Sequence, residues 1–154
     1  MDSVVRRLRE HGLTLPVPKG PVANYVGCKR SGALLFVSAL VSSTRGAAGV
    51  EVPLNEAKSA AQEVALGLLA IVQDYLGDLD AVASVEKLNG FIRSDPEFTQ
   101  QPQVLDGASD VLVAAFGDAG KHARTATGVA QLPYGATVQL EMVLRLRDPA
   151  RVGT

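Results

Sequence analysis

The fold is indicated most clearly by residues 122–146, which read HARTATGVAQLPYGATVQLEMVLRL. Two extended runs flank a Leu-Pro-Tyr-Gly turn at 132–135, and the side chains of the second run alternate. One side carries the apolar set Val138, Leu140, Met142, Leu144 and Leu146. The other side carries the mixed set Gln139, Glu141, Val143, Arg145 and Arg147. We therefore expect a final strand whose apolar side packs under helices and whose mixed side lines an interface or a pocket.

Arg124 lies early in the first of these runs, among small and β-branched residues. A guanidinium offers a planar fork of donors that matches a carboxylate, so Arg124 is a candidate receptor for a small carboxylate. A structural salt bridge at the rim of the fold is the alternative interpretation, because most charged side chains are solvated. The sequence alone leaves both interpretations open.

The clearest helix spans about 56–76, with Pro53 and Asn55 at its start and Gly77 after its end. Apolar residues recur along it at helical spacing, namely Ala57, Ala61, Val64, Leu68, Ile71, Val72 and Tyr75. A second helix is expected from Pro102 to Gly117. The remaining expected elements are a helix at 4–11, an extended lead-in at 15–21, strands at 23–29 and 33–41 around a turn at 30–32, and a strand at 80–93. This order predicts an α+β fold with two main helices on one face of a sheet.

The length of 154 residues predicts a single domain, 1–154, in which 1–20 form the N-terminal helix and lead-in. A net charge of -1 gives no electrostatic reason to expect nucleic acid as a partner. No apolar run is long enough to span a membrane, and the N-terminus lacks the apolar core of a signal peptide. The single cysteine, Cys28, cannot form an internal disulfide, which suits a reducing cytoplasm.

Few residues offer metal or nucleophilic chemistry. His11 and His122 are the only histidines, and no cluster has the spacing of metal ligands, so no metal is expected. His122 can share a strand face with Arg124, or it can lie in the loop that precedes the strand. Cys28 is interpreted as a small strand residue, and Glu141 as the partner of a salt bridge across the sheet.

Several of these motifs together resemble the Rid (reactive intermediate deaminase) family, also called the YjgF family, over about residues 25–146. The resemblance is carried by GALLFVS at 32–38, the long helix at 57–76, FIRS at 91–94 with Phe98, ARTA at 123–126, VAQLP at 129–133 and VQLE at 138–141. It is closest to a longer branch of that family.

The resemblance implies a chorismate-mutase-like fold of the bacillus type, assembled as a homotrimer with ligand pockets between subunits. It implies cofactor-free hydrolysis of a 2-imino acid to a 2-keto acid and ammonia. Arg124 stands at the position of the family's carboxylate-binding arginine, and Tyr25 and Ser38 at those of a pocket tyrosine and serine. Ser109 takes the place of a pocket asparagine.

The chain departs from the deaminating members of the family at four further positions, Ala39, Leu40, Ala126 and Gln139. Ser38-Ala39-Leu40 replaces a Ser-Gly-Gln sequence, and Ala126 replaces a frequent cysteine. Gln139 replaces a glutamate that positions the attacking water. Glutamine can accept a hydrogen bond from water but cannot take its proton, and general-base assistance contributes typically ~10²–10⁴-fold to rate.

Two functions from different classes remain open. The first is an imine or enamine deaminase in which Arg124 anchors the substrate, Tyr25, Ser38 and Ser109 shape the pocket, and Gln139 orients water. The second is a non-catalytic trimeric binder of small carboxylates such as 2-keto acids. The ribonuclease or translation-inhibitor activity ascribed to some relatives ranks third, because the chain has no basic aromatic face.

Overall fold

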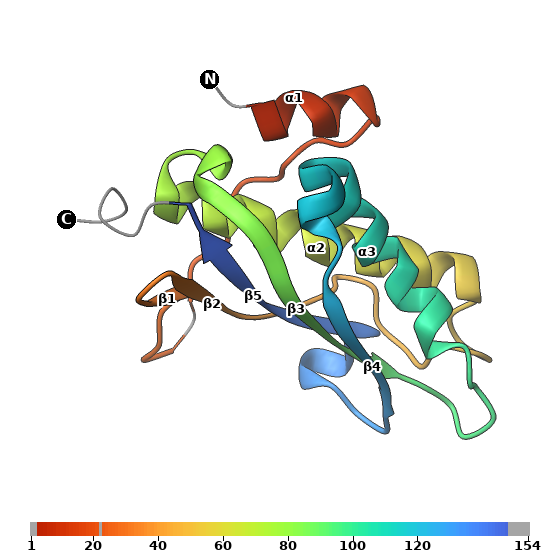
Figure 1. Ribbon diagram of the computed structural model, residues 1–154. Helices are drawn as coiled ribbons and strands as arrows, with labels where there is room; N and C mark the ends of the chain where they lie inside the picture. The colour runs from red at the N-terminus through yellow and green to blue at the C-terminus, as the bar shows by residue number, and fades with distance from the viewer. Residues whose placement is uncertain (1–2, 22, 148–154) are drawn as a thin grey trace.

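The computed structural model describes residues 3–21 and 23–147, which form a five-stranded sheet with helices against one face (Figure 1). The helices are α1 (Ser3–Glu10), α2 (Leu54–Leu76) and α3 (Gln101–Phe116). The strands are β1 (Cys28–Ser31), β2 (Leu34–Val41), β3 (Val82–Arg93), β4 (Ala123–Val129) and β5 (Val138–Leu146). The predicted α+β class and order of elements are confirmed.

The strands are ordered β1-β2-β5-β3-β4 in the sheet. β3 and β4 are parallel, and the other neighbouring pairs are antiparallel. The two runs at the end of the chain are therefore not neighbours, because β3 lies between them. The turn that joins them contains Tyr134 and Gly135, both with positive φ, and carries the chain past the end of β3. Consequently β4, which bears Arg124, is an edge strand.

The two main helices, α2 and α3, lie side by side against the sheet (Figure 1). α2 ends at Leu76, as predicted, and is followed by Gly77, whose φ of 83° lets its N–H bond the Gln73 carbonyl at 2.7 Å. A side chain at Gly107 on α3 would collide with the Lys58 carbonyl of α2, so glycine permits this close crossing. Burial of the α2 stripe is confirmed along most of its length, although Tyr75 is about half exposed.

The short helix α1 is attached to the rest of the fold by Asp80. The Asp80 carboxylate accepts hydrogen bonds from the Ser3 N–H at 2.9 Å, the Ser3 hydroxyl at 2.9 Å and the Val4 N–H at 3.0 Å. Partial burial acts to raise the pKa of Asp80, but these hydrogen bonds outweigh it and hold the pKa below its ordinary value. Asp80 thus caps a helix from a distant part of the chain.

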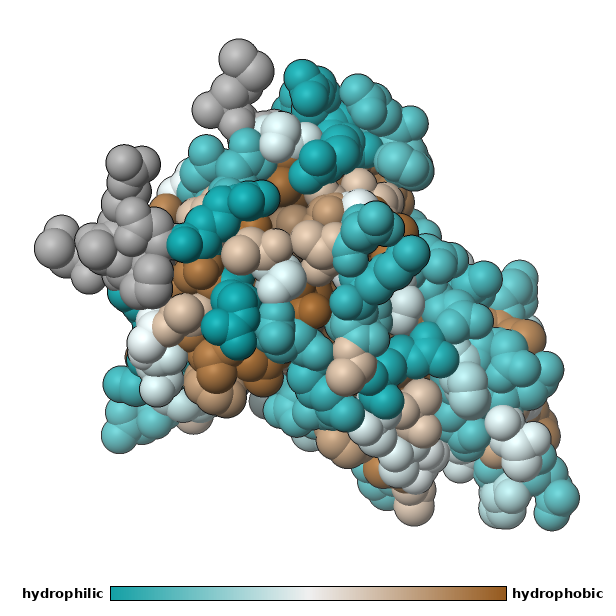
Figure 2. All heavy atoms as spheres, viewed as in Figure 1, coloured by the Kyte–Doolittle hydropathy of each residue, from teal (hydrophilic) through white to brown (hydrophobic). Residues whose placement is uncertain are grey.

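The predicted alternation along β5 is confirmed. Leu140, Met142 and Leu144 are buried beneath the helices, whereas Gln139 and Glu141 are partly exposed on the opposite face. We call that opposite side, which no described helix covers, the open face of the sheet. In the space-filling view, hydrophobic residues reach the surface among hydrophilic ones over the strands (Figure 2).

The strand predicted at 23–29 is wrong over most of its length, because β1 begins at Cys28. The Tyr25 N–H turns back to the Ala23 carbonyl at 2.9 Å, which breaks the extension. The Ser38 N–H bonds the Gly27 carbonyl at 2.9 Å, and the Ser38 hydroxyl donates to the Val26 carbonyl. The register between β2 and β5 shifts between Val37 and Leu40. Tyr25 therefore lies in an irregular segment before the sheet.

Two other boundaries also differ from the prediction. The hairpin turn is at Gly32 and Ala33 rather than at 30–32, and Ser31 pairs with Leu34 across it. The third strand starts at Val82 rather than residue 80, because Leu79–Ala81 forms a 3₁₀ turn capped by Asp78.

Candidate functional site

Arg124 projects from β4 toward α3, on the helix-covered side of the sheet. It lies opposite Leu88 in the β3–β4 register, and Leu88 is fully buried beneath the helices. Its Nη1 donates to Asp106 Oδ1 at 2.7 Å and to Ser109 Oγ at 3.2 Å, both on α3. The Arg124 side chain is 26% exposed and that of Asp106 47%. Arg124 therefore lies at the edge of the fold with its orientation fixed by one helix.

His122 extends this network. Its Nδ1 is 2.6 Å from the Gly120 carbonyl, which can only accept, so Nδ1 carries the proton in that bond. In the neutral ring, Nε2 then accepts from the Ser109 hydroxyl at 2.9 Å. Ser109 thus accepts from Arg124 and donates to His122. His122 precedes β4, as one of its two interpretations held, and it orients Ser109 rather than reaching Arg124 directly.

The salt-bridge interpretation of Arg124 is confirmed, but it accounts for only one of the three guanidinium nitrogens. The two hydrogens of Nη1 go to Asp106 and Ser109. Within the described residues, Nε and Nη2 have no hydrogen-bond partner, and together they form the edge that binds a carboxylate with two bonds. The salt bridge and a carboxylate ligand are therefore compatible.

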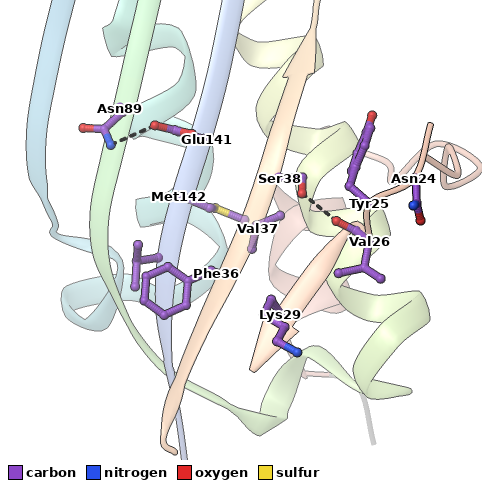
Figure 3. Close-up of a pocket in the computed structure, with 11 residues that line it drawn as sticks. Asn24, Tyr25, Val26, Lys29, Phe36, Val37, Ser38, Asn89, Glu141 and Met142 are labelled. Atoms are coloured by element: carbon purple, nitrogen blue, oxygen red, sulfur yellow. Dashed lines mark hydrogen bonds between the residues drawn. The ribbon is translucent and has the colours of Figure 1, made fainter. Parts of the chain in front are cut away.

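A second group of residues lines a cavity of about 700 Å³ on the open face (Figure 3). Tyr25 and Ser38 belong to it, together with Phe36 from β2, Asn89 from β3 and Glu141 from β5. The Ser38 hydroxyl donates to the Val26 carbonyl at 2.6 Å, so its proton is already engaged. Asn89 Nδ2 donates to Glu141 Oε1 at 3.2 Å, which fixes the carboxylate within the cavity wall.

The structure separates the predicted site residues into two groups. Arg124 and Ser109 contact each other between β4 and α3, and Ala126 follows Arg124 on the same strand face. Tyr25 and Ser38 lie in the open-face cavity. Gln139 also belongs to the open face, opposite Phe91 and Val41.

Neither Gln139 nor Ala39 is among the residues that line the cavity, although Ala39 adjoins Ser38 and is exposed. Within one chain, Arg124 and Gln139 lie on opposite sides of the sheet.

The sequence interpretation missed Asp106, which is the direct partner of Arg124. Asp106 precedes Ser109 by three residues, so both lie on one side of α3, and that spacing is the signal that could have revealed it. The interpretation of Glu141 as a salt-bridge partner was wrong, since its carboxylate accepts a hydrogen bond from Asn89. Arg145 Nε instead lies 3.8 Å from Glu86 Oε1.

Cys28 is a buried residue of β1, as expected. Burial raises its pKa to about 11, which disfavours a nucleophilic thiolate.

The described residues contain no group of three or more His, Cys, Asp or Glu side chains that could hold a metal ion. Among the helices described, none is long and apolar enough to cross a membrane.

Comparison with known proteins places the fold and these residues in a family. The sequence model described as "YjgF/chorismate mutase-like, putative endoribonuclease" matches residues 6–144. The chain belongs to this YjgF family. The resemblance noted in the sequence is thereby confirmed, together with a chorismate-mutase-like fold.

Three relatives show how far this similarity extends. Protein TCP17 of Trypanosoma cruzi is 40% identical over 94% of this chain and 95% of its own length. The structure of Atu1372 from Agrobacterium tumefaciens is 39% identical, with a TM-score of 0.87 over 94% of this chain and 92% of that one. RidA from Psychrobacter sp. PAMC 21119 shares the fold, with 22% identity and a TM-score of 0.55 over 85% and 94% of the two chains.

Proposed function

We propose that this YjgF-family protein is a cofactor-free deaminase of small 2-imino or enamine acids, with Arg124 holding the substrate carboxylate. The observation that carries the proposal is the Nε–Nη2 edge of Arg124, which has no partner among the described residues while Nη1 is held by Asp106 and Ser109. A guanidinium fixed in this way offers a preorganised carboxylate receptor.

The reaction is a hydrolysis. The oxygen of a water molecule bonds to the imine carbon and gives up one proton, and the C=N electron pair moves to nitrogen, which takes up a proton. The C–N bond of the resulting carbinolamine then breaks as its hydroxyl loses a proton and the departing nitrogen gains one, giving a 2-keto acid and ammonia. In this scheme Arg124 holds the carboxylate, Tyr25, Ser38 and Ser109 shape the pocket, and Gln139 orients the water.

The complete site requires a second copy of the chain, and the assembly we propose is a homotrimer. Arg124 is on an edge strand, whereas Tyr25, Ser38 and Gln139 belong to the open face, so one chain cannot bring them together. The open face and the segment beside it also expose apolar groups, with Tyr25 48%, Val26 55% and Phe36 45% accessible. The edge of one subunit against the open face of the next would unite the two groups and cover this surface.

Sedimentation equilibrium is expected to give three times the chain mass of 16.1 kDa at micromolar concentration. Phe36→Glu, which puts a charge into the open face, should shift the protein toward monomer. Thr14→Glu is the matched control, because Thr14 is exposed and lies in the segment between α1 and β1, outside the strands. Sedimentation of the native protein as a monomer would contradict the proposed pocket between subunits.

The proposed activity is tested with 2-iminobutanoate, generated in place by an amino-acid oxidase. We expect the native protein to accelerate the decay of the imine above its spontaneous rate, and Arg124→Ala to lose that acceleration. Identical decay with and without native protein would contradict the deaminase proposal.

The second candidate is a non-catalytic binder of small carboxylates, and Gln139 specifically favours it. A glutamine at this position supplies no base, and the Ser38 proton is held by Val26. Tight binding of 2-ketobutyrate by a protein that leaves imine decay unchanged would establish the binder instead.

A further inference from the structure

We propose that a cavity beside α1 binds a small anion that carries a phosphoryl group, held by Arg7 and Arg147. The cavity has a volume of about 290 Å³ and lies where α1 packs against the end of α3 and the turn before β3 (Figure 1). None of its lining residues belongs to the open-face cavity or to the hydrogen-bond network of Arg124. The proposal therefore does not depend on the function proposed above.

The two arginines come from opposite ends of the chain. Arg7 belongs to α1, and Arg147 directly follows β5. Leu146, the last residue of β5, pairs with Val82 at the start of β3, and the turn before β3 carries Asp80, which caps α1. The fold thereby brings both arginines to the wall of one cavity.

Both guanidiniums are oriented by a hydrogen bond from Nε. Arg7 Nε donates to the Ala115 carbonyl at 2.9 Å, and Arg147 Nε donates to the Asp80 carbonyl at 2.9 Å. Within the described residues, Nη1 and Nη2 of both side chains make no hydrogen bond or ion pair. Each arginine therefore keeps the two-nitrogen edge at its tip, which binds two oxygens of one anion.

The charge of the cavity wall favours an anion. Asp80 also lines the cavity, but both of its carboxylate oxygens already accept hydrogen bonds from Ser3 and Val4 of α1. Two arginines against one aspartate leave a net charge of +1 on the lining side chains. An anion in this cavity therefore meets two oriented cations and a carboxylate whose hydrogen bonds are made to the helix.

The number of forks distinguishes a phosphoryl group from a carboxylate. A carboxylate has two oxygens and occupies one guanidinium edge, which leaves the second arginine without a partner. A phosphoryl group presents three acceptor oxygens and about −1.5 to −2 charges at neutral pH, so it can bond both arginines. The volume is at the lower limit of ligand pockets, about 300–1,000 Å³, which indicates a small molecule.

Binding at this cavity has a consequence for the fold. An anion held by both arginines connects α1 to the end of β5, in addition to the cap that Asp80 gives the helix. A ligand that binds only the folded protein raises its melting temperature, and the increase grows with ligand concentration. The melting temperature therefore reports occupancy of the cavity without any assay of activity.

The experiment measures the binding of inorganic phosphate and of glycerol 3-phosphate to the full-length protein by calorimetry and thermal melting at constant ionic strength. We expect both anions to raise the melting temperature, and Arg7→Gln and Arg147→Gln each to weaken their binding by about tenfold or more, because each variant removes charged hydrogen bonds. Arg9→Gln is the matched control, since Arg9 is an exposed arginine of α1 that does not line the cavity. The tighter of the two anions identifies free phosphate or a phosphate ester as the better ligand.

The increase is compared with the melting temperature of the same variant without ligand, so a less stable variant still gives a result. Arg147 is exposed and follows the last strand, so Arg147→Gln tests the site even if Arg7→Gln does not fold. Unchanged phosphate binding in Arg147→Gln, or an equal increase with chloride at the same ionic strength, would overturn the proposal. Binding that is lost in Arg124→Ala and kept in Arg147→Gln would assign the anion to Arg124 and overturn it as well.

Discussion

Replacing Arg124 with alanine is expected to weaken the binding of 2-ketobutyrate at least tenfold while the protein stays folded. Hydrogen bonds to charged groups contribute roughly 1.5–3 kcal/mol each, and the free edge of Arg124 offers two of them. The partial exposure of Arg124 and Asp106 keeps the structural cost of the change small. Calorimetry on native and variant protein measures the difference.

One complication of this variant can be controlled. Arg124→Ala leaves the Asp106 carboxylate without its cation, and that negative charge would repel an anionic ligand whether or not Arg124 contacts it. The double variant Arg124→Ala with Asp106→Asn removes the repulsion, so binding that stays weak in it identifies a lost anchor. Arg124→Lys restores the charge without the fork and should recover only part of the affinity. Equal affinities of native protein and double variant would refute the role of Arg124.

The elements with a strong periodic signal were the ones that could be predicted from sequence. The alternation of β5 and the apolar stripe of α2 each follow from burial on one side, and Gly77 ends α2 because it adopts a left-handed conformation. The first strand was wrong over most of its length because the chain turns back at Tyr25, whose N–H bonds the Ala23 carbonyl, and because the hydroxyl of Ser38 on the neighbouring strand β2 bonds the Val26 carbonyl. Strand propensity alone does not register such contacts.

The candidate site was predictable only in part, for a similar reason. The spacing of Arg124 and Ala126 places them on one strand face, and the structure confirms this. The partner of Arg124 is Asp106, which lies 18 residues away in the chain and reaches it only because β4 runs beneath α3. A family resemblance groups pocket residues without stating which copy of the chain supplies each, so the separation of Arg124 from Gln139 across the sheet could not be foreseen.

Gln139→Glu is expected to increase the rate of 2-iminobutanoate hydrolysis at least tenfold, and up to about 10²-fold, because general-base assistance contributes typically ~10²–10⁴-fold. The native glutamine can orient a water molecule by accepting a hydrogen bond. A carboxylate of the same size can orient the water and also take its proton. The imine is generated by an amino-acid oxidase, and its decay is followed against the spontaneous rate.

The neighbour that complicates this variant is Glu141, which lies two residues along on the same strand face. Gln139→Glu places a second carboxylate close to it, and like charges on one face disfavour each other. The double variant Gln139→Glu with Glu141→Gln keeps the total charge of the face constant, so an acceleration that persists in it comes from the position of the base.

The pattern of rates then decides between the two functions. Slow native hydrolysis that Gln139→Glu accelerates supports a deaminase limited by a missing base. Rapid native hydrolysis that the variant leaves unchanged would show that Gln139 is not the limiting group, and Glu141, whose carboxylate lines the open-face cavity, would be the next residue to test. No hydrolysis by either protein, together with tight binding of keto acids through Arg124, would establish a carboxylate receptor that keeps the anchor of the family without its chemistry.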